Sequence, residues 1–408
     1  MIRSENLLIK AEKLKKFLIF IRRRIHKNPE LSFREKETAK IIAKQLQCLG
    51  LKVKEKVAET GLVGILKGTN KSERLNEDKS LSKRGKCLLL RADMDALPIE
   101  EKTGFSYKSK ISGRMHACGH DAHCAILLGT AYLLSEIKDL WSGTVKFVFQ
   151  PGEETPPGGA QLMIKEGILE RPKIDAAFAL HLDPEIPLGK IGLKPHTLMG
   201  AADNIKIIII GKGGHAAQPH KSVDTVVIAA QVIQALQTIV SRKVNPLSPV
   251  VITIGTIQGG YRSNIIADKV EMEGTVRTIE PAVREKMPQM IEKIIAGITR
   301  ASDAKYELQY LWGYPPLFND LKMIDLARQS AISLFGKKAI LEIVYPLMGA
   351  EDFTYFLQKV PGALLRLGTR NKAKGVIYPW HHPKFNIDED VLPIGAALLA
   401  KIALDYLK

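Results

Sequence analysis

Apolar runs alternate with helical patterns over the first half of the chain, and three of these runs end in polar clusters. Cys87–Leu90 leads into RADMDALP, Val145–Phe149 leads into QPGEE, and Ala176–Leu180 leads into His181. A further strand-like run covers Leu62–Leu66. Short apolar runs separated by helical segments are typical of buried strands in a parallel sheet. Ligands bind such sheets beyond the carboxyl ends of the strands, so we predict that these polar clusters form a site.

Residues 200–312 follow a different pattern, with longer strands and two amphipathic helices. The predicted order is strand Ile205–Ile210, helix Ser222–Val240 with Ser222 as N-cap, strands Val250–Ile257 and Val270–Ile279, helix Pro281–Arg300, and strand Tyr306–Trp312. This β-α-β-β-α-β order is typical of a ferredoxin-like domain. We therefore predict an α/β protein. A mixed, mostly parallel sheet flanked by helices is formed by residues 1–199 and 313–408, and the ferredoxin-like domain 200–312 is inserted into it.

Length and composition agree with this division. A single core stops growing at roughly 250–300 residues, and the chain has 408. No apolar run approaches the ~18–20 residues of a membrane helix. Residues 7–25 instead predict an amphipathic basic helix, and Glu5 and Glu12 make a transit peptide the weaker alternative. The segment Asn70–Lys86 is polar and charged, which predicts a surface loop or local disorder.

The net charge of +17 does not by itself indicate a nucleic-acid-binding protein. A basic patch for nucleic acid would need interleaved aromatic residues or a recognisable module, and the basic region 1–56 has neither, so a solvated surface is the favoured interpretation. Only four cysteines occur, too few for a disulfide scaffold. A reducing compartment, the cytoplasm, is therefore expected.

The segment HACGHDAH at 116–123 is the clearest candidate for metal chemistry. Cys118 and His120 are two residues apart, so one loop can direct both toward one point, and thiolate with imidazole suits zinc and its first-row neighbours. The alternative is a plain helix start with Asp121 in the first turn and Ala125–Leu134 as the buried stripe. Both interpretations hold if the loop before the helix binds the metal.

The other candidates are weaker when each is taken alone. Glu153 and Glu154 follow a strand within QPGEE, where one carboxylate could bind metal while the other transfers protons. His181 follows a strand, and the pair His381 and His382 lies in WHHPKF near the end of the chain. The alternative for the Glu pair is a solvated turn, and for His181 it is a hydrogen-bonded structural histidine. For the His pair it is a surface loop.

Ten segments together resemble peptidase family M20, the di-metal aminoacylase and carboxypeptidase family. The resemblance is strongest to its amidohydrolase branch, which includes hippurate, N-acyl-amino-acid and auxin-conjugate hydrolases. The segments are HKNPELSFRE (26–35), RADMDALPI (91–99), HACGHDAH (116–123), FQPGEE (149–154), HLDPEIPLG (181–189), GKGGHAAQPH (211–220), NIIAD (264–268), GTVRT (274–278), MGAEDF (348–353) and HHPKFNIDE (381–389). Two segments depart from the common family pattern. This chain has NIIAD where many relatives have NVIPD, and QPGEE where many have QPAEE, but neither change affects a functional side chain.

The resemblance implies a role for each candidate. The implied ligands of two divalent cations, Mn²⁺ or Zn²⁺ with Co²⁺ or Ni²⁺ as alternatives, are Cys118, His120, Glu154, His181 and His382. Asp95 would orient a ligand, and Glu153 would be the general base. From domain 200–312, acting as a lid and dimerisation domain, His215 would lie near the scissile carbonyl, while Asn264 and Arg277 would bind the substrate carboxylate.

The implied activity is hydrolysis of the amide bond of N-acyl amino acids, a small-molecule substrate. Glu153 would take a proton from water activated by the cations and return it to the leaving amine. The resemblance also implies a homodimer or higher oligomer through the lid, and we expect no nucleic-acid or membrane partner. Two alternatives remain: a dipeptidase or carboxypeptidase of the same family, and a catalytically silent metal- or nucleic-acid-binding protein.

Overall fold

The structure, a computed structural model, describes residues 4–70 and 85–408. Most of the segment predicted as a polar loop, 71–84, lies outside the described residues. The chain divides into two compact units. The larger unit comprises Met1–His196, Phe318–Val344 and Asp352–Lys408, and the smaller comprises Thr197–Leu317 and Tyr345–Glu351. The segment predicted as a lid, 200–312, falls within the smaller unit, and its role as a lid stays a prediction.

A mixed sheet of eight strands forms the centre of the larger unit, in the order β1-β2-β4-β3-β5-β16-β6-β15. The strands are β1 (Lys52–Val57), β2 (Gly61–Lys67), β3 (Cys87–Asp93), β4 (Thr144–Gln150), β5 (Ala176–Pro187), β6 (Ile191–Leu193), β15 (Ile340–Glu342) and β16 (Gly362–Arg370). The central neighbours β4, β3, β5 and β16 are parallel. Since β3 and β4 are buried along their whole length, the prediction of buried parallel strands is confirmed, and their carboxyl ends lie at one edge.

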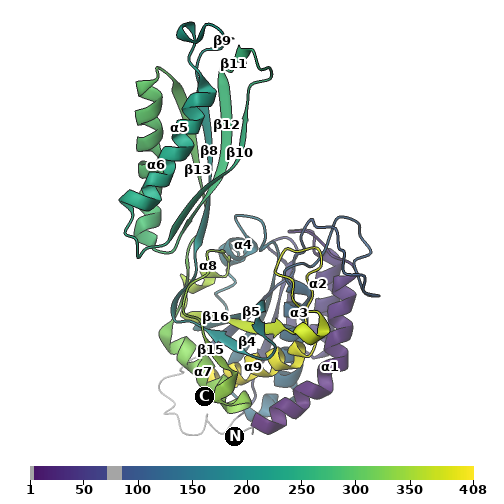
Figure 1. Cartoon of the computed structure of the whole chain (residues 1–408). Coiled ribbons are helices and arrows are strands. Elements are labelled where there is room, and N and C mark those ends of the chain that lie inside the picture. The colour runs from purple at the N-terminus through teal and green to yellow at the C-terminus, as the bar shows by residue number, and fades with distance from the viewer. Residues whose placement is uncertain (1–3, 71–84) are drawn as a thin grey trace. The chain divides into compact units, whose positions relative to one another are not determined.

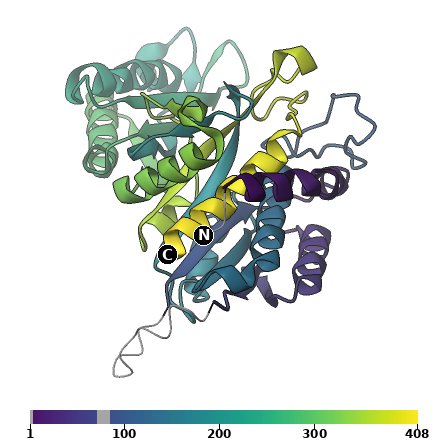
Figure 2. The ribbon, with the colours of Figure 1, turned by 90° about the horizontal axis from the view of Figure 1, so that it is seen from below.

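Helices cover this sheet and complete its core. They are α1 (Ser4–His26), α2 (Lys36–Cys48), α3 (His120–Glu136), α4 (Gly159–Lys165), α7 (Leu321–Phe335), α8 (Thr354–Leu357) and α9 (Val391–Leu407). Figure 2 shows α1 in purple beside α9 in yellow. Nearly every side chain of α3 is buried, because α3 packs against α1, α9 and β3. The position of α3 matters for the site, since the candidate metal segment leads into its first turn.

The predicted basic helix at the N-terminus is confirmed as α1, but its buried face contains two residues that the apolar pattern did not indicate. Arg22 and His26 are both buried. Arg22 Nε donates to Asp121 Oδ2 at 2.7 Å, and His26 Nδ1 lies 2.8 Å from the same oxygen. These contacts join α1 to the first turn of α3, so part of the charge predicted to be solvated instead stabilises the interior.

The smaller unit contains a four-stranded antiparallel sheet with two helices on one face (Figure 1). Its main elements are β8 (Ala201–Ile210), α5 (Thr225–Thr238), β10 (Val250–Gly259), β12 (Lys269–Thr278), α6 (Pro281–Ala301) and β13 (Lys305–Tyr314). The predicted order β-α-β-β-α-β is confirmed, with the strands arranged β10-β12-β8-β13. Short strands β9 (Gly214–His215) and β11 (Ile265–Ile266) pair at one end, and β7 (His196–Met199) and β14 (Leu317–Asn319) lie where the chain passes between the units.

Two expectations about α5 were wrong. The N-cap is Asp224 and not Ser222, because the Asp224 side chain accepts from the backbone N–H groups of Val226 and Val227. The helix also continues through a π-turn to Lys243. The resulting 19 residues, with a mean hydropathy of 1.2, are long and apolar enough to cross a membrane by those two criteria, although no such run was expected. One face of this helix instead packs on the sheet of the smaller unit.

Candidate metal centre

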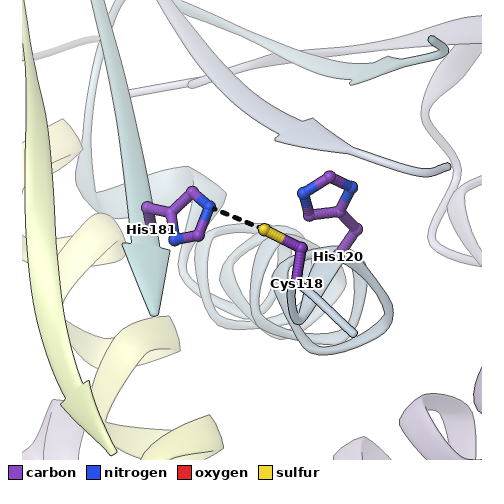
Figure 3. Close-up of side chains that lie close together, drawn as sticks. All are labelled: Cys118, His120 and His181. Carbon is purple, nitrogen blue, oxygen red and sulfur yellow. Dashed lines mark hydrogen bonds between the residues drawn. The ribbon is translucent and has the colours of Figure 1, made fainter. Parts of the chain in front are cut away.

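The loop before α3 brings Cys118 and His120 to the carboxyl edge of the large sheet. Gly119 adopts a φ of +97°, a left-handed conformation that turns the chain between the two side chains and into the helix. Cys118 Sγ lies 3.5 Å from Nε2 of His181, which projects from β5 (Figure 3). All three side chains are buried, and their ligand atoms lie within 4.8 Å of one another. The predicted convergence of this segment with the end of β5 is therefore observed.

His181 is held in the tautomer that a metal ligand requires. Its Nδ1 lies 2.8 Å from the carbonyl oxygen of Leu182, which can only accept a hydrogen bond. The proton therefore resides on Nδ1, and the lone pair of Nε2 points toward Cys118. Burial lowers the pKa of His181, and the neighbouring His123 and Arg366 lower it further. The ring is consequently neutral, the form that coordinates metals.

His120 contacts Asp95, the aspartate that is predicted to orient a ligand, and that role stays a prediction. Nδ1 of His120 lies 2.9 Å from the carbonyl oxygen of Asp95 and 3.3 Å from its Oδ1. Nε2 faces Asp93 and Glu154, with Glu154 Oε1 at 3.9 Å, and has no hydrogen-bond partner among the described residues although it is buried. A buried nitrogen without a partner is costly, and a bound cation would remove that cost.

The turn after β4 places two carboxylates beside His120. Gly152 has a φ of +63°, and Glu153 and Glu154 follow it. Glu153 is buried and has a carboxylate oxygen within 4.8 Å of ligand atoms of both His120 and Glu154. The backbone N–H of Glu154 donates to Asp95 Oδ2 at 2.9 Å, while its Oε1 is buried without a hydrogen-bond partner in the described part of the chain. Glu154 thus resembles His120, with a ligand atom exposed only to the interior of the cluster.

The C-terminal histidine of the cluster is His381 and not the predicted His382. His381 Nε2 lies 3.4 Å from Glu154 Oε1, and its backbone N–H donates to the carbonyl of Ala117, the residue before Cys118. The ring of His382 instead stacks on Tyr378, and its Nδ1 accepts from the N–H of Lys384. The backbone φ of His381 is +62°, which directs the two adjacent side chains to different sides.

The electrostatics of the cluster favour an additional cation. Burial and the charge of Glu154 raise the pKa of the Cys118 thiol. The neighbouring Cys118 and Glu154 raise the pKa of His381 to about 10, so that a protonated imidazole lies where positive charge is needed. A divalent cation would displace both protons, because it is a stronger local charge. The donor set of one thiol, three imidazoles and a carboxylate therefore fits metal binding.

His215, predicted near the scissile carbonyl, and the predicted substrate-binding residues Asn264 and Arg277 lie in the smaller unit, and they are not all together. His215 and Asn264 are exposed neighbours at the β9–β11 end (Figure 1), where His215 pairs with Ile265. Arg277 is half-buried in β12, and burial lowers its pKa. It lies eight residues beyond Lys269, the first residue of that strand. At ~3.3 Å per residue this places Arg277 about 25 Å from the β9–β11 end.

Sequence reasoning missed three residues that hold the site in place. His123 Nδ1 lies 2.6 Å from Asp93 Oδ1, and its Nε2 accepts from the backbone N–H of Leu182. Ser32 and Glu35 contact the turn that contains Glu153. His123 belonged to the HACGHDAH cluster, but no role was assigned to it, and the segment 26–35 was used only as a family motif. The polar residues of this segment, which lie just before a helix, were the only sequence feature that could have indicated a role.

Comparisons with known proteins identify the family. The model of peptidase family M20/M25/M40 matches residues 89–405. The chain is 40% identical to thermostable carboxypeptidase 1 of Saccharolobus solfataricus, over 97% of each chain. It is 41% identical to N-acetyl-L-cysteine deacetylase of Bacillus subtilis, over 96% of this chain and 88% of that protein. The crystal structure of the Bacillus subtilis YXEP protein, a dinuclear metal-binding peptidase from the M20 family, is similar with a TM-score of 0.81 and 33% identity, covering 97% of this chain and 99% of that one. The chain therefore belongs to peptidase family M20/M25/M40 and is a metal-dependent amide hydrolase.

Proposed function

We propose that the chain hydrolyses the amide bond of N-acyl amino acids with two divalent cations held by Cys118, His120, Glu154, His181 and His381. The observation that carries the proposal is the convergence of these five side chains beside Glu153, with Cys118, His120 and His181 buried, Glu154 half-buried and His381 exposed. Two of their ligand atoms, His120 Nε2 and Glu154 Oε1, are buried without a hydrogen-bond partner among the described residues. Cys118 belongs to both the His120–His181 group and the Glu154–His381 group, which fits a centre with two cations.

The donor set favours Mn²⁺ or Zn²⁺, with Co²⁺ and Ni²⁺ as alternatives, since imidazole and carboxylate serve all four. A thiolate ligand requires reducing conditions, and the four cysteines, Cys48, Cys87, Cys118 and Cys124, are all free. This supports a cytoplasmic location. When bound, the cations would supply Lewis acidity that lowers the pKa of water and polarises an amide carbonyl.

Glu153 is the proposed general base. Its side chain is buried beside the proposed ligands but follows a turn that gives Glu154 a different direction. The Glu153 carboxylate takes a proton from the attacking water and delivers it to the nitrogen of the leaving amine, so one side chain serves both halves of the reaction. Asp95 keeps His120 oriented and holds the backbone N–H of Glu154, which preserves the separation of the two carboxylate roles.

Arg277 is the proposed anchor for the substrate carboxylate. A guanidinium binds a carboxylate through two parallel hydrogen bonds, which fixes the substrate in orientation as well as in place. Partial burial strengthens such an ion pair relative to a fully solvated one. An N-acyl amino acid carries this carboxylate close to its amide, so the group that binds also aligns the bond to be cleaved.

We propose that His215 and Asn264 act on the substrate of a second copy of the chain. The separation of about 25 Å from Arg277 exceeds the length of a small N-acyl amino acid, so one smaller unit cannot place all three on one substrate. A dimerisation surface is available on β10, an edge strand with exposed Val251 and Ile257. Exposed apolar edge strands are common sites of pairing between chains.

Mixing two inactive variants tests this arrangement. In a mixed dimer of His215→Ala and Glu153→Gln chains, one site combines an intact Glu153 with an intact His215 from the other chain. We expect activity to appear on mixing and subunit exchange. If His215 serves its own chain, every site in the mixed dimer stays defective and no activity appears. Sedimentation of the mixture establishes independently that dimers are present.

The substrate class is tested with a panel of compounds. Similarity to a protein named as a carboxypeptidase supports peptide substrates for this chain, whereas similarity to one named as an N-acetyl-L-cysteine deacetylase supports N-acyl amino acids. Metal-stripped protein reloaded with one metal at a time should be assayed on N-acetyl and N-benzoyl amino acids and on dipeptides. We expect kcat/KM to be highest for N-acyl amino acids. A clear preference for dipeptides would replace the proposal by a peptidase, and no hydrolysis with any metal would indicate a silent binding protein.

A further inference from the structure

Residues 32–35 form a contact between the N-terminal segment and the turn that contains Glu153. The Glu35 carboxylate is fully buried. Its Oε1 accepts from the backbone N–H of Gly152 at 2.9 Å and from that of Phe33 at 3.0 Å. Its Oε2 accepts from Thr60 Oγ1 at 2.5 Å. One carboxylate therefore fixes the backbone N–H of Gly152, the residue before Glu153, and ties it to Phe33 and Thr60.

The backbone N–H of Glu154, the residue after Glu153, is also held by a carboxylate. The N–H of Glu154 donates to Asp95 Oδ2 at 2.9 Å, and Ser32 Oγ donates to that oxygen at 2.7 Å. Ser32 Oγ also lies 3.0 Å from Thr155 Oγ1, with Thr155 as donor. A buried carboxylate thus holds the backbone N–H of each neighbour of Glu153: Glu35 holds that of Gly152, and Asp95 holds that of Glu154.

The packing at this point leaves little freedom. Gly152 has a φ of +63°, and a Cβ added to it would lie 2.4 Å from Cζ of Phe33. Phe33 has a φ of +61°, a conformation that is strained for a bulky residue. The surrounding structure must hold such a conformation, and Glu35 does so by accepting the Phe33 N–H. The Phe33 ring and the Glu35 carboxylate therefore constrain Gly152 from two directions.

We infer that Glu35 is a positioning residue for Glu153, acting through the backbone of Gly152 without touching the substrate. The inference rests on the proposed role of Glu153 as general base. A base must lie within hydrogen-bond reach of the proton that it removes, and small displacements of a catalytic group reduce turnover strongly. Within the described part of the chain, the Glu35 carboxylate bonds to Gly152, Phe33 and Thr60 and not to the proposed ligands or the substrate anchor, so its loss should reduce kcat and leave metal content and KM unchanged.

Three substitutions at position 35 test the inference. Glu35→Gln keeps an oxygen that accepts from both N–H groups and should retain at least about half of the wild-type kcat. Glu35→Asp keeps the charge but is shorter by one methylene, and Glu35→Leu keeps the bulk but removes the acceptor. Both should lower kcat about 10–100-fold, the range for groups that orient an active-site residue. KM and metal content should stay within about twofold. Glu37→Leu, two residues further along in the first turn of α2, is the matched control, since Glu37 is exposed.

The outcomes separate this inference from the proposed function. Wild-type kcat in Glu35→Asp and Glu35→Leu, with Glu153→Gln inactive, overturns the inference alone. A fully active Glu153→Gln overturns both. Loss of activity in Glu35→Gln with retention in Glu35→Asp would show that the charge acts, which also overturns it. If Glu35→Leu does not fold, the ranking of Glu35→Gln above Glu35→Asp still decides the question, and equal thermal midpoints show that both are folded.

Discussion

His381 Nε2 lies 3.4 Å from Glu154 Oε1, whereas the ring of the next residue, His382, stacks on Tyr378 with ring centroids 4.6 Å apart. The two histidines are adjacent in sequence and of the same type, yet only one faces the candidate metal centre. The backbone hydrogen bond from His381 to Ala117 brings it to the loop that contains Cys118. This relationship leads to the most direct test of the ligand set.

His381→Ala should reduce metal content and abolish activity, while His382→Ala should retain both. His382 stacks on Tyr378 and accepts from Lys384 and not from the proposed ligands, so a general folding defect would not separate the two variants in this way. Metal content by elemental analysis and kcat/KM are the measurements. Normal metal content in His381→Ala, or loss of metal in His382→Ala, would contradict the assignment.

Glu153→Gln should keep its metal and lose most turnover. The amide fills the same volume but cannot accept the proton, and general-base catalysis typically contributes 10²–10⁴-fold to rate. Metal analysis and kcat are measured on the same preparation. Glu154→Gln serves as the comparison, because loss of a proposed ligand should lower metal content as well as activity. Turnover near the wild-type level in Glu153→Gln would remove the base assignment.

Arg277→Ala should raise KM strongly for free-acid substrates and have little effect on substrates whose carboxylate is amidated. The lost interaction is a charge-assisted bidentate pair, worth about 1.5–3 kcal/mol, which corresponds to roughly a 10–100-fold change. Arg277→Lys keeps the charge but not the paired geometry, so its KM for free-acid substrates should lie between those of the wild type and Arg277→Ala. Equal kinetics of Arg277→Ala on both kinds of substrate would rule out the carboxylate contact.

Arg22→Leu should destabilise the larger unit far more than Arg23→Leu. Arg22 is buried and pairs with buried Asp121, so its removal leaves an uncompensated charge, at a cost of roughly 3–5 kcal/mol. Arg23 pairs with Glu389 from a partly exposed position, where such a pair is worth about 1 kcal/mol or less. Urea unfolding of the two variants measures the difference. Similar unfolding midpoints would contradict the importance of the α1–α3 contact.

Stability of the metal-free protein should fall as pH rises through the titration of Glu35. Burial raises the pKa of Glu35 to about 7, and the charge of Asp95 adds to this effect, against an ordinary value of 4.5. The folded state therefore binds this proton more tightly than the unfolded chain. The stabilisation is complete below pH 4.5 and is lost as pH rises through about 7.

The corresponding measurement compares Glu35→Gln with the wild type. Because glutamine does not titrate, the stability of the variant relative to wild type should increase by up to about 3 kcal/mol between pH 4.5 and pH 8. Unfolding free energies at both pH values, with the exposed Glu37→Gln as control, give the result. A constant difference between variant and wild type across this range would contradict the raised pKa.

The sequence alone indicated the main buried strands and the order of elements in the inserted domain. Buried strands such as Cys87–Leu90 and Val145–Phe149 are recognisable because a parallel strand is apolar on both faces. The alternation of strands and helices indicated an inserted β-α-β-β-α-β domain, and this order was observed. The rule that sites lie at the carboxyl ends of strands grouped His181 with the polar clusters that follow these two strands, whereas the set Cys118, His120 and His181 came from the resemblance to peptidase family M20; these three side chains do converge.

Only the tertiary structure decided which way individual side chains point and which residues they contact. Nothing in the letters HH distinguishes His381 from His382, because the positive φ of His381 and its bond to Ala117 depend on the rest of the fold. Asp224 caps α5 in place of Ser222 for a similar reason, since the cap is the residue whose side chain reaches the first free N–H groups. Glu35 reaches Gly152 across 117 positions of sequence, and periodicity reports only which face of an element is buried. Local pattern determines what each element is, whereas long-range hydrogen bonds determine which side chains meet.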